Sequence, residues 1–398
     1  MFSNWLNLPR NIYLLCLSQI IGMSATTLVI LLGGLIGADL APSTTLATLP
    51  ITLMVAGLAV FTIPAPLLMK KIGRRNGFII SAITSALSTF LAALAITHHN
   101  FFLFCLSTFL LGTHGAFIQQ YRFAAVESVQ KHLAGKAVGL VLLAGIVAGF
   151  LGPEIAKHTK DLFSFPLYAG SFISLSVLFV IAAVMLLLFK NPTSQKQEIR
   201  GHERSVKRII IQPSFFLAVI AASVAYGVMV FIMTATPLHL LKVVHYHFDQ
   251  TAFVIQSHIV AMFLPSLFTG ILIEKFGVFR ILVTGILSFL ISVLLAINAH
   301  SLPLFWITLV VLGVGWNFLF ISSTVLLSRS YEHSERFKTQ GINDFVVVMS
   351  QLLATFFAGS ILFGTGWINL NMITLPIILI TLTIFVLYRK SLTSPITT

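Results

Sequence analysis

Charged residues are scarce in this chain. Of its 398 residues only 9% are Asp, Glu, Lys or Arg, and just 11 are acidic. A soluble domain carries about 25% charged residues, so the composition excludes an ordinary soluble globular protein. The scarcity of carboxylates also disfavours a site for a hard cation such as Mg²⁺, which prefers oxygen ligands.

Cysteine is nearly absent as well. The two cysteines, Cys16 and Cys105, both lie in apolar runs. Two isolated thiols predict neither a disulfide framework nor a thiolate cluster. Buried cysteine usually acts as a small apolar residue, and we expect that here.

Hydrophobic residues, in contrast, make up 57% of the chain and form long runs separated by short polar breaks. A helix needs about 20 such residues to cross the hydrocarbon core of a bilayer. We therefore predict an all-α membrane protein with twelve transmembrane helices. The predicted spans are 11–36, 45–69, 77–96, 101–122, 136–157, 165–189, 214–240, 251–273, 279–298, 302–328, 340–363 and 370–388.

The basic residues are distributed unevenly over the loops between these spans. Of the 24 lysines and arginines, only Lys157, Lys160 and Lys242 fall in one of the two alternate sets of loops. By the positive-inside rule the other set faces the cytoplasm. We therefore expect an inner-membrane protein with both termini cytoplasmic, and we interpret the net charge of +13 as a topology signal rather than as affinity for nucleic acid.

A long polar stretch divides the chain in two. Residues 190–213 contain Asn191-Pro192 and several charges, and they show no apolar periodicity. We predict a cytoplasmic linker there, between an N-terminal six-helix bundle over residues 1–189 and a C-terminal six-helix bundle over residues 214–398.

The two halves repeat a short loop motif. The segment 68–75 (LMKKIGRR) follows the second span and the segment 270–277 (GILIEKFG) follows the eighth. Both resemble the glycine-rich, charged loop of major facilitator superfamily transporters, although Lys70 stands where that family usually has an aspartate. The resemblance implies two pseudo-symmetric bundles with a substrate site near the midplane between them.

Two further motifs place soft metal ligands inside consecutive spans. Met229 and Met233 are four residues apart in the seventh span, and His258 and Met262 are four apart in the eighth. Residues at this spacing share one face of a helix. Thioethers favour Cu(I) and imidazole also binds copper, so these residues predict a copper site. The alternative for the methionines is ordinary core packing.

This pair of motifs, with His258 inside the segment 256–266 (QSHIVAMFLPS), resembles the signature of CcoA-like copper importers, which are major facilitator members. The resemblance implies that Met229, Met233, His258 and Met262 handle copper, and that the metal supplies the assembly of haem-copper oxidases. No role is transferred to the cysteines.

Other side chains are weaker candidates, each with an ordinary alternative in core packing, a solvated loop or a structural ion pair. Candidates for the metal path or the cavity are His239, His245, His247, Met23, Met54 and His114. An offset of 204 residues between the loop motifs places Met54 opposite His258. Candidates for coupling or gating, because charge inside a membrane is costly, are Glu154, Asp344, Arg122 and Glu127.

We therefore expect a monomeric secondary transporter, not an enzyme, that imports a copper ion or a small copper complex by alternating access. Copper is the transported substrate, and no prosthetic group is expected. The lipid bilayer is the only other partner, with no nucleic acid. The alternative is a major facilitator transporter of a small organic solute, a drug or a metal chelate.

Overall fold

The computed structural model of the protein describes residues 8–130, 134–162, 167–191, 204–331 and 335–389, and every regular element in these ranges is a helix. Most of the predicted linker, residues 192–203, lies outside the described residues, as do residues 1–7 and 390–398 at the termini. The chain divides into two compact units, Met1–Lys196 and Gln197–Thr398.

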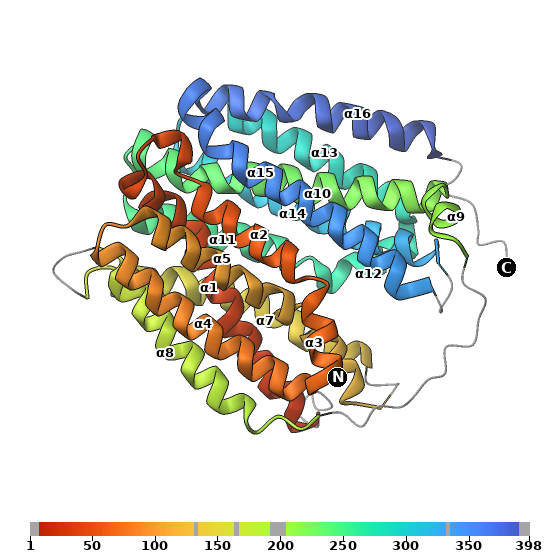
Figure 1. Cartoon of the computed structure of the whole chain (residues 1–398). Coiled ribbons are helices and arrows are strands. Elements are labelled where there is room, and N and C mark those ends of the chain that lie inside the picture. The colour runs from red at the N-terminus through yellow and green to blue at the C-terminus, as the bar shows by residue number, and fades with distance from the viewer. Residues whose placement is uncertain (1–7, 131–133, 163–166, 192–203, 332–334, 390–398) are drawn as a thin grey trace. The chain divides into compact units, whose positions relative to one another are not determined.

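The first unit is built from long helices that run alongside one another (Figure 1). Helix α1 packs mainly on α7, α2 on α5, and α4 on both α5 and α8. Its elements are α1 (Arg10–Leu40), η2 (Thr44–Leu46), α2 (Leu49–Phe61), α3 (Pro64–Ile72), α4 (Arg74–Thr97), α5 (Phe101–Ile118), α6 (Tyr121–Glu127), α7 (Ala134–Thr159) and α8 (Ala169–Leu186).

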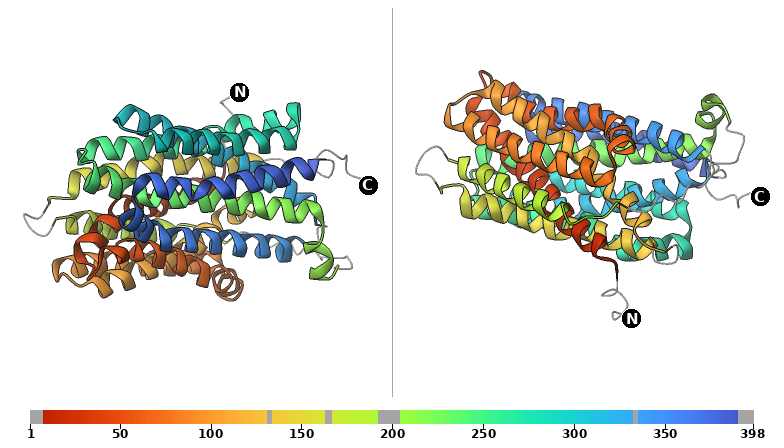
Figure 2. Two further views of the ribbon diagram at one scale, coloured as in Figure 1. Left: turned by 90° about the horizontal axis from the view of Figure 1, so that it is seen from above. Right: turned by 60° about the horizontal axis from the view of Figure 1, so that its bottom comes forward.

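The second unit has the same kind of construction, and two further views confirm that its long helices lie side by side (Figure 2). Helix α14 packs on α10, α11 and α13, while α15 packs on α10. Its elements are α9 (Val206–Ile210), α10 (Pro213–Leu238), η4 (His239–Val243), α11 (Phe248–Phe263), α12 (Ser266–Phe276), α13 (Val278–Ile297), α14 (Leu302–Ser328), α15 (Arg336–Met372) and α16 (Thr374–Leu387).

The helices confirm the predicted all-α membrane fold. Within the described residues, ten helical segments are long and apolar enough to cross a bilayer, and the bent pair α11 and α12 makes an eleventh. The last segment, Thr339–Leu387, has 49 residues and contains both α15 and α16. A straight helix of that length would extend about 74 Å, more than twice the hydrocarbon core. It therefore supplies two crossings, which gives the predicted twelve.

Two of the predicted spans are broken rather than continuous. The span over 45–69 ends as α2 before Ile63 and resumes as α3 at Pro64, and the span over 251–273 is split at Leu264 and Pro265. Proline has no N–H to donate and its ring clashes with the preceding turn. In the second unit α11 and α12 meet at a bend of 41°.

The loop repeat has a matching backbone conformation in the two units. Gly73 has φ 84° and ψ 156°, and Gly277, 204 residues later, has φ 85° and ψ 153°. Each glycine N–H closes the end of the preceding helix by bonding the carbonyl four residues back, in Met69 and Ile273. A residue with a Cβ is strained at this φ, so the loop motif of each half requires glycine.

Close helix crossings also correspond between the units. A Cβ on Gly57 of α2 would overlap the carbonyl oxygen of Phe109 on α5. At the positions 204 residues later, a Cβ on Gly313 of α14 would lie 3.0 Å from the Cβ of Ala261 on α11. Small residues let two helix backbones approach closely in membranes. Each unit therefore places a glycine at this crossing, on opposite members of the helix pair.

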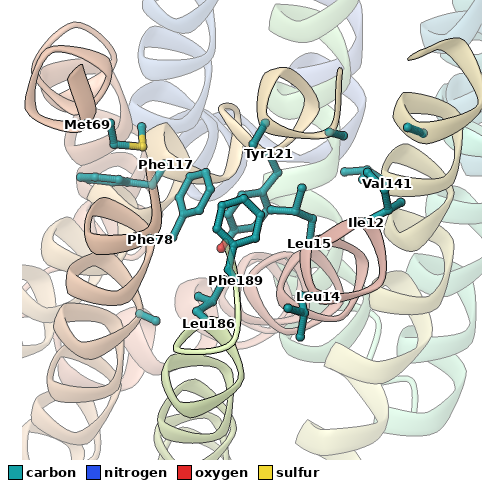
Figure 3. Close-up of a cluster of buried hydrophobic side chains, with 14 of the residues drawn as sticks. Ile12, Leu14, Leu15, Met69, Phe78, Phe117, Tyr121, Val141, Leu186 and Phe189 are labelled. Carbon is teal, nitrogen blue, oxygen red and sulfur yellow. The ribbon is translucent and has the colours of Figure 1, made fainter. Parts of the chain in front are cut away.

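The first unit has an aromatic and aliphatic core near one end of its helices (Figure 3). The ring of Phe78 on α4 lies edge-on to Tyr121 at 4.7 Å and to Phe189 at 5.7 Å. Ile12 and Leu15 of α1 are fully buried in the same cluster. Edge-to-face pairs at these distances are favourable, and they tie α4, α6 and the end of α8 to α1.

Candidate substrate site

The four soft-ligand residues are all buried within the second unit. Met229 and Met233 on α10 are 5% and 4% exposed, and His258 and Met262 on α11 are 0% and 9% exposed. None of these side chains is turned toward lipid. The expectation that they face the protein interior is therefore met, whatever they bind.

Helix α14 is the common neighbour of the two helices that carry these residues. The main contacts of α11 are with α14, and those of α10 are with α14 and α15. A Cβ on Gly313 of α14 would lie 2.7 Å from the carbonyl oxygen of His258, so the α11 and α14 backbones touch beside the histidine. The sequence analysis treats the seventh and eighth spans as a pair, but the site also includes α14.

The imidazole of His258 is held in one tautomer. Its Nδ1 lies 2.7 Å from the carbonyl oxygen of Leu309 on α14. A carbonyl only accepts hydrogen bonds, so Nδ1 carries the proton and, in the neutral ring, Nε2 keeps a lone pair. Nε2 is buried and has no protein partner. It can accept a hydrogen bond from a substrate or ligate a metal, since metal-binding histidines commonly donate their other N–H to a carbonyl.

The methionine face of α10 also turns toward α14. Tyr226 precedes Met229 by three residues and Met233 by seven, so the three side chains share one face of the helix. The ring of Tyr226 lies edge-on to Trp316 of α14, with centroids 5.2 Å apart. Both soft-ligand pairs therefore lie on helix faces directed at α14. Within the described ranges, however, no group of three or more His, Cys, Asp or Glu side chains is arranged to hold a metal ion.

Four aromatic rings gather beside these residues, and we call them the α14 aromatic cluster. It consists of Tyr226, Phe263, Trp316 and Phe320. Trp316 stacks on Phe320 at 5.0 Å with an interplanar angle of 15°, and Tyr226 stands perpendicular to both. Phe263 of α11 meets Trp316 edge-on at 5.8 Å. The indole N–H of Trp316 is buried without a hydrogen-bond partner.

The helix break beside the cluster is held by Asn317. Its amide nitrogen lies 2.6 Å from the carbonyl oxygen of Met262 and 2.7 Å from the hydroxyl of Ser266, and its oxygen accepts from Thr269 at 2.6 Å. These bonds satisfy polar groups at the bend, where Pro265 cannot donate an N–H. They fix the end of α11, the start of α12 and the adjacent Trp316 relative to one another.

The sequence analysis missed the aromatic cluster and Asn317. A signal for them exists in the segment 313–320 (GVGWNFLF), in which Trp316 and Phe320 are four apart beside an amide inside an apolar span. A polar side chain in such a run is a functional candidate for the same reason as His258.

The three outer candidates of the second unit lie in different surroundings. His239 is buried and stacks on Trp367, with ring centroids 4.6 Å apart and an interplanar angle of 8°. His245 has a left-handed backbone (φ 63°), and His247 caps the start of α11. Both are exposed. The structure does not bring His245 or His247 together with His258.

The three candidates of the first unit are held by local contacts. Met54 is buried on α2, and the partly buried Met23 accepts a hydrogen bond from the Gln19 amide at 3.0 Å. His114 is buried on α5, where its Nδ1 lies 2.5 Å from the Ser81 hydroxyl. Its Nε2 has no protein partner, and a Cβ on Gly22 would lie 2.8 Å from that atom.

The four charged candidates make local contacts. Glu127 forms a two-pronged ion pair with Arg74, at 2.5 and 2.6 Å. The guanidinium of Arg122 lies 4.8 Å from the ring centre of its neighbour Phe123.

The remaining two candidates lie within helices. Glu154 lies 3.2 Å from His158, and Asp344 accepts from Asn343 at 3.1 Å. The expectation that Glu154 ends its helix is wrong, because α7 continues through Pro153 to Thr159.

Comparison with known proteins identifies the family. The Major Facilitator Superfamily matches residues 14–264 and 219–397. The riboflavin transporter RfnT of Brucella anthropi is 37% identical over 384 residues, covering 96% of each chain. The uncharacterised transporter YdeG of Bacillus subtilis is 26% identical over 382 residues, covering 92% of this chain and 88% of YdeG.

Solved structures show the same fold at low identity. A bacterial homologue of the human lysosomal transporter Spinster, inward-facing and occupied, aligns with a TM-score of 0.75 at 15% identity, over 96% of this chain and 98% of that one. A POT family transporter in complex with 5-aminolevulinic acid aligns with a TM-score of 0.74 at 12% identity, over 97% of both chains. This protein belongs to the Major Facilitator Superfamily and is a multi-pass membrane transporter, not an enzyme.

Proposed function

We propose that this transporter imports riboflavin, or a closely related flavin, across the bacterial inner membrane by alternating access, with both termini in the cytoplasm. The observation that carries the proposal is 37% identity to a riboflavin transporter over 96% of both chains. This relative favours the organic-solute alternative over copper. The orientation follows from the distribution of lysine and arginine.

The α14 aromatic cluster supports a flat aromatic substrate. Ligand sites are usually lined by hydrophobic and aromatic side chains with a few placed polar groups. Tyr226, Phe263 and Phe320 are partly exposed, so they have ring surface that a flavin ring system can contact. Aromatic pairs contribute about 0.5–1.5 kcal/mol beyond the area that they bury.

Transport of riboflavin is tested directly by uptake. In a bacterial strain that neither makes nor imports riboflavin, the protein should restore growth at low riboflavin and raise uptake of radiolabelled riboflavin well above an empty-vector control. Unlabelled riboflavin should compete with the label, whereas an equal concentration of cytidine should not. Uptake equal to the control, with the protein present in the membrane, would reject the proposal.

Copper is the second candidate substrate because of His258. Its buried Nε2 keeps a free lone pair, and the thioethers of Met229, Met233 and Met262 are buried on helix faces directed at the same neighbouring helix. Thioether and imidazole ligands suit Cu(I). The ligand set would then be the one that the sequence motifs predict.

A double variant separates the two candidates. Met229→Leu with Met233→Leu removes both thioethers and conserves volume, which cores tolerate well. For a flavin importer we expect riboflavin uptake within about twofold of the wild type, and no copper-64 uptake by either protein. If the wild type accumulates copper-64 and the double variant does not, copper replaces riboflavin as the substrate.

A further inference from the structure

Two buried polar atoms of the second unit are left without partners on helices that touch each other. Nε1 of Trp316, on a side chain 3% exposed, can only donate a hydrogen bond. Nε2 of His258, on a side chain 0% exposed, is an acceptor because Nδ1 donates to Leu309. Buried polar groups are rarely left unpaired, since each costs about 1–3 kcal/mol. One unpaired donor and one unpaired acceptor together indicate a ligand that supplies the complementary groups.

The two atoms belong to one seam between α11 and α14. Leu309, which holds the imidazole, and Trp316 are seven residues apart and so share a face of α14, separated by about 10 Å along the helix. Phe263, five residues after His258 on α11, contacts the ring of Trp316. A ligand lying along this seam must be elongated to reach both groups.

The aromatic rings add a second requirement. Tyr226 and Phe320 are only partly buried, and Tyr226 stands at 87° to the Phe320 ring. Flat ligands gain most from such ring surfaces, while an aliphatic solute or a metal ion gains little. The amide of Asn317 makes three hydrogen bonds within the protein. Its role is to hold the Trp316 segment in position.

We propose that this seam is the binding subsite for the flavin ring system. The Trp316 N–H donates to a ring carbonyl, the His258 Nε2 accepts from an N–H or hydroxyl of the same ligand, and Tyr226 and Phe320 contact its flat faces. A flavin has an elongated, planar, three-ring head with carbonyl and N–H groups at one end and a chain of hydroxyls on its middle ring. The subsite rests on the proposed function for its substrate.

Trp316 distinguishes this subsite from a copper site. His258 serves either reading, because a lone pair can accept a hydrogen bond or ligate a metal. An indole N–H has no lone pair to offer a metal ion. A requirement for the Trp316 N–H is therefore specific to a ligand with an acceptor.

The test measures riboflavin binding to the purified full-length protein in detergent, by titration calorimetry. Trp316→Phe keeps an aromatic ring and removes the N–H, and it should weaken riboflavin binding about tenfold, the effect of losing one good hydrogen bond. His258→Leu should weaken binding by a similar factor. The matched control is Trp367→Phe, at a buried tryptophan of the same unit whose N–H bonds the Ala296 carbonyl at 2.9 Å. It should bind riboflavin within twofold of the wild type.

The outcomes separate the subsite from the proposed function. If the wild type binds riboflavin but Trp316→Phe binds as well as Trp367→Phe does, the subsite is wrong and riboflavin transport stands. If the wild type does not bind riboflavin up to its solubility limit, both proposals fail. Thermal unfolding without ligand accompanies each titration, and the subsite is supported only if weaker binding by Trp316→Phe comes with a Tm no lower than that of Trp367→Phe.

Discussion

Arg204→Ala is expected to destabilise the second unit by about 3–5 kcal/mol, because it leaves a buried carboxylate without its charged partner. Glu335 is 0% exposed. Nε and Nη2 of Arg204 donate to its two oxygens at 2.7 and 2.6 Å, and the backbone N–H of Arg204 donates at 2.8 Å. In detergent, the Tm of the purified protein should fall by about 10 °C.

A matched control isolates the effect of burial. Arg74 makes the same two-pronged contact with Glu127, but the Glu127 side chain is 45% exposed. Exposed ion pairs contribute about 0–1 kcal/mol, so Arg74→Ala should lower the Tm by no more than about 3 °C. Equal shifts for Arg204→Ala and Arg74→Ala would show that burial of Glu335 does not determine the stability of this contact.

The sequence was sufficient to predict the membrane-spanning helices, because a bilayer requires about 20 apolar residues per crossing and the chain meets that requirement in clear runs. It did not predict the breaks before Pro64 and at Pro265. A run of apolar residues keeps its hydrophobicity across a proline, and neighbouring helices can satisfy the freed backbone groups. In the second unit Asn317 supplies that compensation, and a residue 52 positions away from Pro265 cannot be paired with it from sequence alone.

The candidate site was predicted only in part, for a related reason. His258 could be found because an imidazole stands out in an apolar run. The rings of Tyr226, Trp316 and Phe320 could not be distinguished from core packing, because helical periodicity shows which residues share a face but not which helix that face meets. Only the packing of α10 and α11 on α14 brings these rings beside the histidine. Soft ligands without the surrounding rings favoured copper, and the rings together with the riboflavin transporter favour a flavin.

The glycine repeat, in contrast, was predictable in position and in kind. Gly73 and Gly277 stand at equal places in the two loop motifs, and both adopt a positive φ that glycine alone tolerates well. Their agreement also aligns residues deeper in each unit, including Ala261 with Gly57. Sequence symmetry therefore identifies equivalent crossings, although it does not predict which helix of each pair carries the glycine.

Gly112→Ala is expected to destabilise the first unit by about 3 kcal/mol, at the upper end of the range for overpacked cores. A Cβ at Gly112 on α5 would overlap the backbone carbonyl of Met54 on α2, and a backbone group cannot rotate away as a side chain can. The two helices must separate for the methyl group to fit, so the Tm of the purified protein should fall by about 6–12 °C. The control is Gly139→Ala on α7, where an added Cβ has no atom within 4 Å. The same chemical change there should raise stability by about 0.5–1 kcal/mol, because alanine loses less backbone entropy in a helix. A Tm for Gly112→Ala at or above that of Gly139→Ala would mean that α2 and α5 do not pack backbone to backbone at Met54.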